Sequence, residues 1–148
     1  MPKNITVKNL AYLAGFLDGD GSIYVRLKPN PTYRFGFQIS PCIAFFQAKK
    51  EKENFARVCA LVGAGYMRER KDGIMEYVVN KKDDIVDFLS QVKPYLILKR
   101  RQAELMIKIF EMKEKVRDQK DFEKLAGMID KFRELNYSKK RKRHNLTP

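Results

Sequence analysis

The sequence predicts an α+β fold in the order α-ββ-α-ββ-α-α, with a four-stranded antiparallel sheet and helices on one face. Apolar residues recur at helical spacing near the N-terminus and again from residue 83 onward. By contrast, residues 22–46 and 66–80 alternate apolar and polar side chains, as strands do. Turn-forming residues, at Pro29–Thr32 and Lys71–Gly73, divide each alternating stretch, so each is expected to form a hairpin.

The first helix is expected to follow Thr6, a suitable N-cap residue. Two glycines, Gly19 and Gly21, are expected to end it in a turn. Its apolar stripe consists of Leu10, Leu13, Ala14 and Leu17. Further helices are expected at residues 50–62, 83–92, 99–116 and 121–135.

The alternation gives each hairpin an apolar face and a polar or basic face. The second strand of the first hairpin is expected to include residues 35–44. The apolar face is expected to gather Ile23, Val25, Leu27, Phe35, Phe37, Ile39, Ile43, Met75, Tyr77 and Val79.

Charge is the strongest compositional signal. The chain of 148 residues carries 31 basic and 18 acidic residues, a formal net charge of +13. Such a surplus favours a polyanionic partner, most often a nucleic acid. Hydrophobic residues make up 44% of the chain, which is enough to build a core. One domain is therefore expected at residues 1–137, followed by a basic tail at 138–148.

Cysteine and histidine usage narrows the possible chemistry. Cys42 and Cys59 are not spaced as a ligand pair, so reduced thiols and an intracellular location are expected. The single histidine, His144, nearly excludes a histidine-based zinc site. Any metal is then expected to be held by carboxylate and carbonyl oxygens, which favours Mg²⁺, Mn²⁺ or Ca²⁺.

The segment Leu13–Gly21, LAGFLDGDG, places Asp20 at the electronegative end of a helix. A carboxylate there is unfavourable unless a cation meets it. A plain helix stop is one interpretation, because Asp and Gly favour turns. A calcium-binding loop is a second, but the EF-hand pattern needs acids where this chain has Phe16 and Leu27.

A third interpretation is that the segment resembles the LAGLIDADG motif of homing endonucleases, in their single-motif branch. The long hairpin after the motif, the order of the remaining elements and the stretch Ser138–Lys142 are similar as well. Two motif helices pack around a twofold axis in that family, so a single motif implies a homodimer. The resemblance implies an interface of Leu10, Leu13, Ala14 and Leu17, and a catalytic metal, Mg²⁺ or a substitute such as Mn²⁺, held by Asp20 and the Gly19 carbonyl.

The resemblance implies two further catalytic residues. Gln47, expected just after the second strand, would orient water, and Lys99, at the start of a helix, would face the scissile phosphate. Relatives carry a basic residue a few positions after the glutamine, and this chain departs from them with Glu51. By helical phase, Asp18 is expected to matter less than Asp20.

The polar face of the sheet carries side chains that suit base edges, and a two-stranded ribbon fits the major groove of double-stranded DNA. The candidate base-reading residues are Tyr24, Arg26, Lys28, Asn30, Thr32, Tyr33, Gln38, Ser40, Arg68, Arg70, Glu76 and Asn80. The basic run of Lys139, Lys140, Arg141, Lys142 and Arg143 is expected to contact phosphates, which adds affinity without sequence information.

The sequence thus predicts an intron-encoded, site-specific endonuclease that makes metal-dependent double-strand cuts in a long, roughly palindromic DNA target. The alternative is a maturase-type splicing factor of the same fold, whose partner would be its own intron RNA. The presence of both Asp20 and Lys99 favours cleavage.

Overall fold

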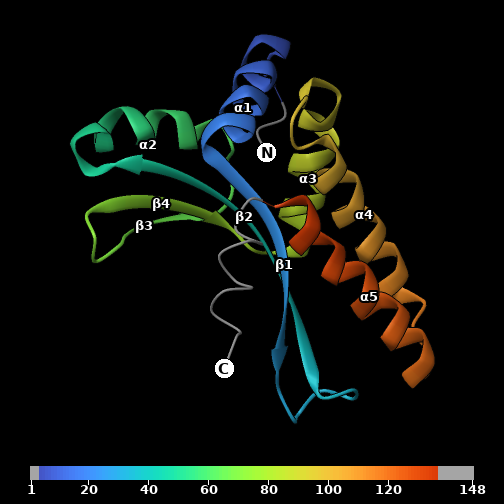
Figure 1. Ribbon diagram of the computed structural model, residues 1–148. Coiled ribbons are helices and arrows are strands. Elements are labelled where there is room, and N and C mark those ends of the chain that lie inside the picture. The colour runs from blue at the N-terminus through green and yellow to red at the C-terminus, as the bar shows by residue number, and fades with distance from the viewer. Residues whose placement is uncertain (1–3, 137–148) are drawn as a thin grey trace.

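The computed structural model describes residues 4–136, arranged as a sheet backed by helices (Figure 1). The elements run in the order α1 (Val7–Asp20), β1 (Gly21–Pro29), β2 (Phe37–Ala48), a 3₁₀ turn η1 (Lys49–Glu51), α2 (Lys52–Ala60), β3 (Tyr66–Glu69), β4 (Ile74–Val79), α3 (Lys82–Val92), a 3₁₀ turn η2 (Lys93–Tyr95), α4 (Arg100–Glu114) and α5 (Gln119–Leu135).

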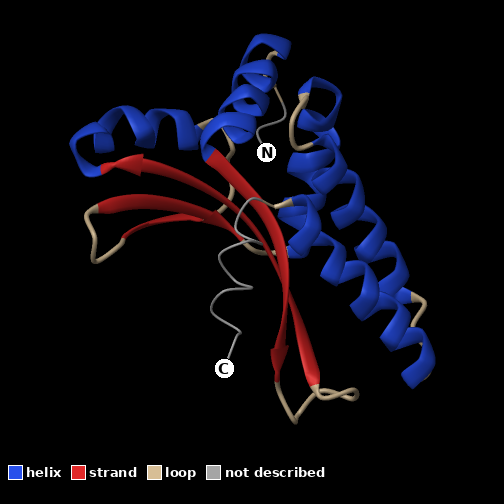
Figure 2. Cartoon of the chain, in the orientation of Figure 1, coloured by secondary structure: helices blue, strands red, loops and turns tan. Residues whose placement is uncertain are grey.

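The four strands form one antiparallel sheet in the order β1-β2-β4-β3. Figure 2 shows that the strands arch and that the helices lie on one side of the arch. The predicted fold class is therefore confirmed, although three helices (α3, α4 and α5) rather than two follow the second hairpin. Among the helices described between residues 4 and 136, none is long and apolar enough to cross a membrane.

Helix α1 begins as predicted but ends differently. The Thr6 hydroxyl accepts a hydrogen bond from the Asn9 N–H at 3.1 Å, so Thr6 is the N-cap. The predicted glycine turn is wrong, because the helix continues through Asp20 and Gly21 enters β1 with an extended backbone. A Cβ at Gly21 would lie 2.9 Å from the Leu17 backbone, so close packing requires this glycine.

The core lies between the sheet and the helices. Leu13, Ala14 and Leu17 of α1 are fully buried there, with Met75 and Val79 of β4. The apolar faces of both hairpins thus point inward, as the alternation predicts. A second, smaller cluster of Cys42, Ala44 and Val78 lies apart from this core, with Tyr24 and Phe46 packed against it.

The two hairpin turns differ in how well the sequence predicted them. The second turn is confirmed, with the Gly73 N–H donating to the Arg70 carbonyl at 3.1 Å and Gly73 at φ 79°. The first turn runs over residues 30–36 and is longer than predicted, so Phe35 precedes β2. The Asn30 side chain accepts from the Thr32 N–H and hydroxyl, which closes a local turn and delays the strand.

Candidate active site and nucleic-acid interface

Asp20 is the last residue of α1, and the next residue, Gly21, pairs with Phe45 of β2. The Asp20 side chain is exposed, and within residues 4–136 no hydrogen bond or ion pair engages its carboxylate. The Gly19 carbonyl is one of the last four of the helix, which have no intrahelical partner. Both groups therefore present oxygen atoms to a ligand.

Lys99 lies beside the end of α1, although it comes from the start of α4. It is the N-cap residue of α4, and its ammonium donates to the Asp18 carbonyl at 2.6 Å. Burial lowers the pKa of this ammonium, and the Asp18 and Asp20 carboxylates offset part of that shift. The structure thus places Lys99 beside the end of α1, where the Asp20 carboxylate influences its pKa.

Asp18 holds Lys99 in place. Its carboxylate accepts the backbone N–H groups of Ile97, Leu98 and Lys99, at 2.8, 3.1 and 3.0 Å. Asp18 therefore fastens the loop before α4 to the end of α1. Helical phase alone could not show this role, because the three donors lie about 80 residues away in the sequence.

Asp18→Ala is expected to loosen this loop. It removes the acceptor for three N–H groups. Hydrogen bonds to a charged group contribute at most about 1.5–3 kcal/mol each, and the bonds to Ile97 and Leu98 contribute less because they are exposed. Both the melting temperature and the rate of the DNA cleavage that the family resemblance implies should fall, because Lys99 loses its fixed position. Asp18→Asn keeps one acceptor oxygen and should fall between the alanine variant and the wild type. An alanine variant with wild-type melting and cleavage would contradict this role.

A hollow of about 690 Å³ lies beside these residues. Two of its lining residues, which the sequence analysis missed, close it with side-chain hydrogen bonds. Gln102 donates to the Leu135 carbonyl and Asn136 to the Ile23 carbonyl, each at 3.2 Å. The sequence could have pointed to Gln102, because it is a polar residue on the buried face of α4. The lining comprises Asp18, Gly19, Gly21, Ser22, Phe46, Leu98, Lys99, Gln102, Leu135 and Asn136.

Gln47 and Glu51 lie on the β2 side of the site. Gln47 is inside β2 rather than after it, and its Oε1 accepts the Ala48 N–H at 3.1 Å. It does not line the hollow. Glu51 accepts from the Asn54 amide at 3.1 Å, and the nearby Lys49 pairs with Glu69 at 3.1 Å. Glu51 thus has a local partner at the start of α2.

The predicted dimer interface needs correction. Leu13, Ala14 and Leu17 are completely buried inside their own chain, so they cannot meet a second copy, and Leu10 is partly buried against the same core. The free face of α1 is instead the opposite one, and its exposed residues are Val7, Lys8, Ala11, Tyr12, Gly15 and Gly19.

Most of the predicted base-reading residues on the strands lie on the sheet face that the helices leave open. Gln38 of β2 pairs with Lys28 of β1, so its side chain lies on the same open face, nearer to the hairpin tip. Asn30, Thr32 and Tyr33 lie instead in the turn between β1 and β2, where Tyr33 borders a hollow shared with Phe35, Phe37 and Phe122. Arg70 follows β3 and pairs with Asp72 at 2.8 Å, and the basic run at residues 139–143 lies outside the described residues. One concavity on this face is lined by Tyr24, Arg26, Lys28, Ser40, Pro41, Cys42, Tyr66, Arg68, Glu76, Val78 and Asn80.

Glu76 is not free to contact a base. It is 5% exposed, and its carboxylate accepts from the Nε and Nη2 of Arg68 at 3.0 and 2.9 Å. The prediction that Glu76 itself reads DNA is therefore corrected: Glu76 orients Arg68, whose remaining N–H groups stay available. Nearby, the Arg26 guanidinium lies 4.9 Å from the centre of the Tyr24 ring. Burial raises the pKa of that tyrosine, so it stays neutral.

Comparison with known proteins identifies the family. A sequence model of the LAGLIDADG endonuclease family matches residues 13–109, which span the site from Leu13 to Lys99. The chain belongs to the LAGLIDADG endonuclease family.

Two relatives resemble this LAGLIDADG protein over most of its length. DNA endonuclease I-CreI of Chlamydomonas reinhardtii is 36% identical over 134 residues, covering 90% of this chain and 82% of the relative. DNA endonuclease I-CvuI of Chlorella vulgaris is 30% identical over 131 residues, covering 88% and 81%. The crystal structure of I-CvuI with the I-CreI target DNA and Mg superposes with a TM-score of 0.81 at 28% identity, covering 88% and 83%. A second I-CvuI crystal contains its own target and Ca.

Proposed function

We propose that this chain is a site-specific homing endonuclease that cuts both strands of a long DNA target and uses a divalent cation, with Mg²⁺ as the natural ion. One observation carries the proposal. The free Asp20 carboxylate lies beside the half-buried Lys99 at the edge of a sheet whose polar face is open. The naming of I-CreI and I-CvuI as DNA endonucleases supports it.

The oxygen atoms at the end of α1 fit a hard cation. Mg²⁺ prefers carboxylate and carbonyl ligands, which Asp20 and Gly19 supply. Within the described part of the chain, no group of three or more His, Cys, Asp or Glu residues could hold a metal ion. One chain therefore offers only part of a site, and a second Asp20 would complete it.

A second copy of the chain would supply that Asp20 if the two chains packed against each other through the free face of α1. Gly15 and Gly19 leave open space where a Cβ would stand, so another helix can approach closely. Val7 and Tyr12 on this face are 64% and 54% exposed, and the neighbouring Ile97 and Leu98 are 82% and 71% exposed. Large apolar side chains so exposed are typical of an interface. We infer a homodimer through this face.

Each residue then has a defined task in phosphodiester hydrolysis. A divalent cation, when bound, would polarise the phosphate and lower the pKa of the attacking water. Asp20 and the Gly19 carbonyl would hold that cation. Lys99, fixed by Asp18, offsets negative charge that develops on the phosphate. Gln47 would orient solvent. None of the relatives reported above is named for RNA binding, so no observation favours the maturase-type alternative.

The proposal can be tested without knowing the natural target. Duplexes that bind the protein are selected from a randomised library in EDTA, and Mg²⁺ is then added to the selected complexes. The expected result is a roughly palindromic site that is cut in both strands with Mg²⁺ and left intact in EDTA. Selected duplexes that stay uncut in Mg²⁺ and in Mn²⁺ would show a DNA-binding protein without nuclease activity.

A further inference from the structure

The outer half of the β1–β2 hairpin extends beyond the rest of the sheet (Figure 1). Strand β4 pairs with β2 only from Ile43 to Ala48, whereas β1 pairs with β2 as far out as Pro29 and Phe37. Within the sheet, residues 37–42 therefore pair with β1 alone. A two-stranded hairpin is only marginally stable in water by itself. The outer half needs support from elsewhere in the chain.

The tip of this hairpin is closed by its own hydrogen bonds. The Asn30 N–H donates to the Gly36 carbonyl at 2.8 Å, and the Gly36 N–H donates to the Tyr33 carbonyl at 2.9 Å. The Asn30 side chain accepts from the Thr32 hydroxyl at 2.6 Å. Gly36 has φ 81°, a conformation that other residues rarely adopt. The tip is thus a small unit with a defined shape, which can be positioned as a whole.

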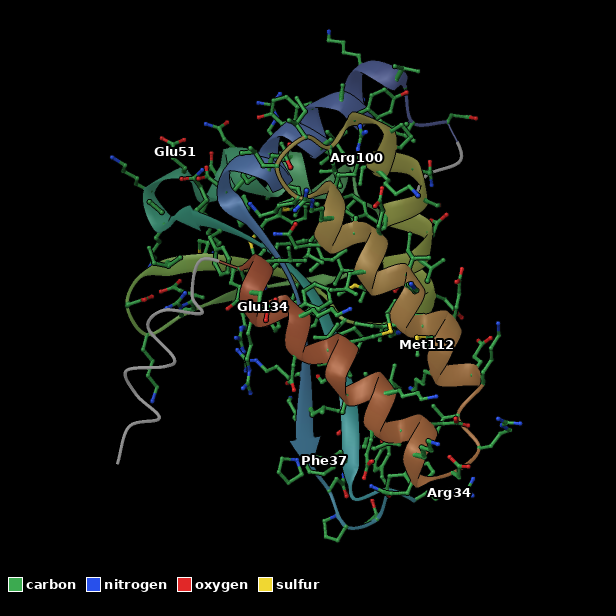
Figure 3. All side chains as sticks on the ribbon, turned by 45° about the vertical axis from the view of Figure 1, so that its right-hand side comes forward. Arg34, Phe37, Glu51, Arg100, Met112 and Glu134 are labelled. Carbon is green, nitrogen blue, oxygen red and sulfur yellow. The ribbon has the colours of Figure 1, made fainter. Side chains whose placement is uncertain are left out.

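Helix α5 holds this unit from the inner side. The ring of Phe122, in the first turns of α5, stacks on Phe35 at 5.0 Å and on Phe37 at 6.2 Å between ring centres. The Arg34 side chain donates to the carbonyl of Arg117 at 2.7 Å. Figure 3 shows Arg34 and Phe37 at the hairpin end beside the start of α5.

The corner between α4 and α5 is itself well fixed. The Asp118 side chain accepts the Asp121 N–H at 2.8 Å and caps α5. The Arg117 side chain pairs with Asp121 at 3.2 Å. Because Phe122 follows these residues directly, its ring is anchored to a capped helix rather than to a loop.

We propose that Phe122 is a positioning residue for DNA recognition. By holding the hairpin tip at the α4–α5 corner, it fixes where Asn30, Thr32 and Tyr33 meet the outermost base pairs of each half-site. Phe122 lies on the inner side, so the polar outer face of the ribbon stays free for the DNA groove. This inference rests on the proposed function. It assigns the reading of the outer base pairs jointly to the hairpin and to a helix that packs on its inner side.

The test compares two equivalent substitutions in one helix. Phe122→Leu and Phe132→Leu each remove a buried aromatic ring of α5, but only the first ring contacts the hairpin tip. Relative binding to every single-base change in the selected target is measured for both variants. Phe122→Leu should lose about fivefold or more of the discrimination at the outer positions, because one base-pair preference is typically worth about 5- to 150-fold. Its preferences at the inner positions should be unchanged.

The control variants separate positioning from stability. Phe132→Leu should keep the wild-type preference profile, although it also loses a core ring. Phe122→Tyr keeps the stacked ring and should restore discrimination at the outer positions. Phe37→Ala, at a partly exposed position on the inner face, should reproduce the outer loss even if Phe122→Leu does not fold.

Each outcome decides a different point. A Phe122→Leu or Phe37→Ala profile identical to the wild-type profile would overturn this inference and leave the proposed nuclease intact. A uniform loss at all positions would also overturn it, because that is the signature of general destabilisation. If the wild type binds no duplex in the selection, the proposed function itself fails.

Discussion

Asp20→Asn should abolish DNA cleavage and leave DNA binding intact. The change keeps the shape of the side chain and removes the charge that would hold the cation. Metal assistance is worth several kcal/mol in the transition state, so cleavage should fall by about a thousandfold or more. Binding in EDTA should be at least as tight as in the wild type, because a negative charge near the phosphates is lost.

Asp83→Asn is a suitable control for Asp20→Asn. Asp83 lies in the first turn of α3, among the helices that cover the inner face of the sheet. The Asp83→Asn variant should cleave DNA at the wild-type rate. The comparison requires single-turnover cleavage in Mg²⁺ and a binding titration in EDTA. Cleavage by Asp20→Asn at the wild-type rate would remove Asp20 from the site.

Gly15→Glu should convert the protein into an inactive monomer that is still folded. A Cβ at Gly15 meets no atom within 4 Å in a single chain, so the fold has room for the side chain. Glutamate also favours a helix over glycine by about 0.5–1 kcal/mol, so thermal stability should not fall. In a dimer, however, the long charged side chain would separate the two α1 helices. Both sedimentation as a dimer and double-strand cleavage should be lost.

Gly127→Glu provides the matched control. Gly127 is also an exposed helical glycine with open space at its Cβ position, but it lies in α5 rather than on the free face of α1. This variant should remain dimeric and active. A wild-type protein that sediments as a monomer, both free and on DNA, would refute the dimer. A dimeric Gly15→Glu would place the interface elsewhere.

Local patterns in the sequence determined most of the fold. The alternation at residues 23–27 and 75–79 reflects the twofold repeat of a strand, and this assigned both hairpins and their inner faces. The side chain of Thr6 needs only the next turn of the helix to act as an N-cap, so it was also predictable. These features depend on neighbours within a few residues, which a sequence displays directly.

The first turn and the end of α1 were predicted less well for different reasons: close packing sets the role of Gly21, and local hydrogen bonds lengthen the first turn. Gly19 and Gly21 suggested a turn at the end of α1, but Gly21 instead lets the backbone of Leu17 approach closely. The segment after Asn30 suggested a short turn, but hydrogen bonds of Asn30 with Thr32 and with Gly36 close a longer turn over residues 30–36. In both places the residue type indicated a special position in the backbone, but the sequence alone did not show which physical role the residue has there.

The sequence by itself determined that α1 has an apolar stripe, that Asp20 lies near the C-terminal end of this helix and that the sheet has a basic face. Only the tertiary structure decided what covers each surface. Periodicity shows that one face of a helix is apolar, but it does not show whether that face is buried by the sheet of the same chain or by a second copy. In this chain, Leu13, Ala14 and Leu17 pack inside their own chain. The partners of Asp18 and Glu76 were also beyond the sequence, because a carboxylate's role depends on donors that folding brings from distant residues or from a neighbouring strand.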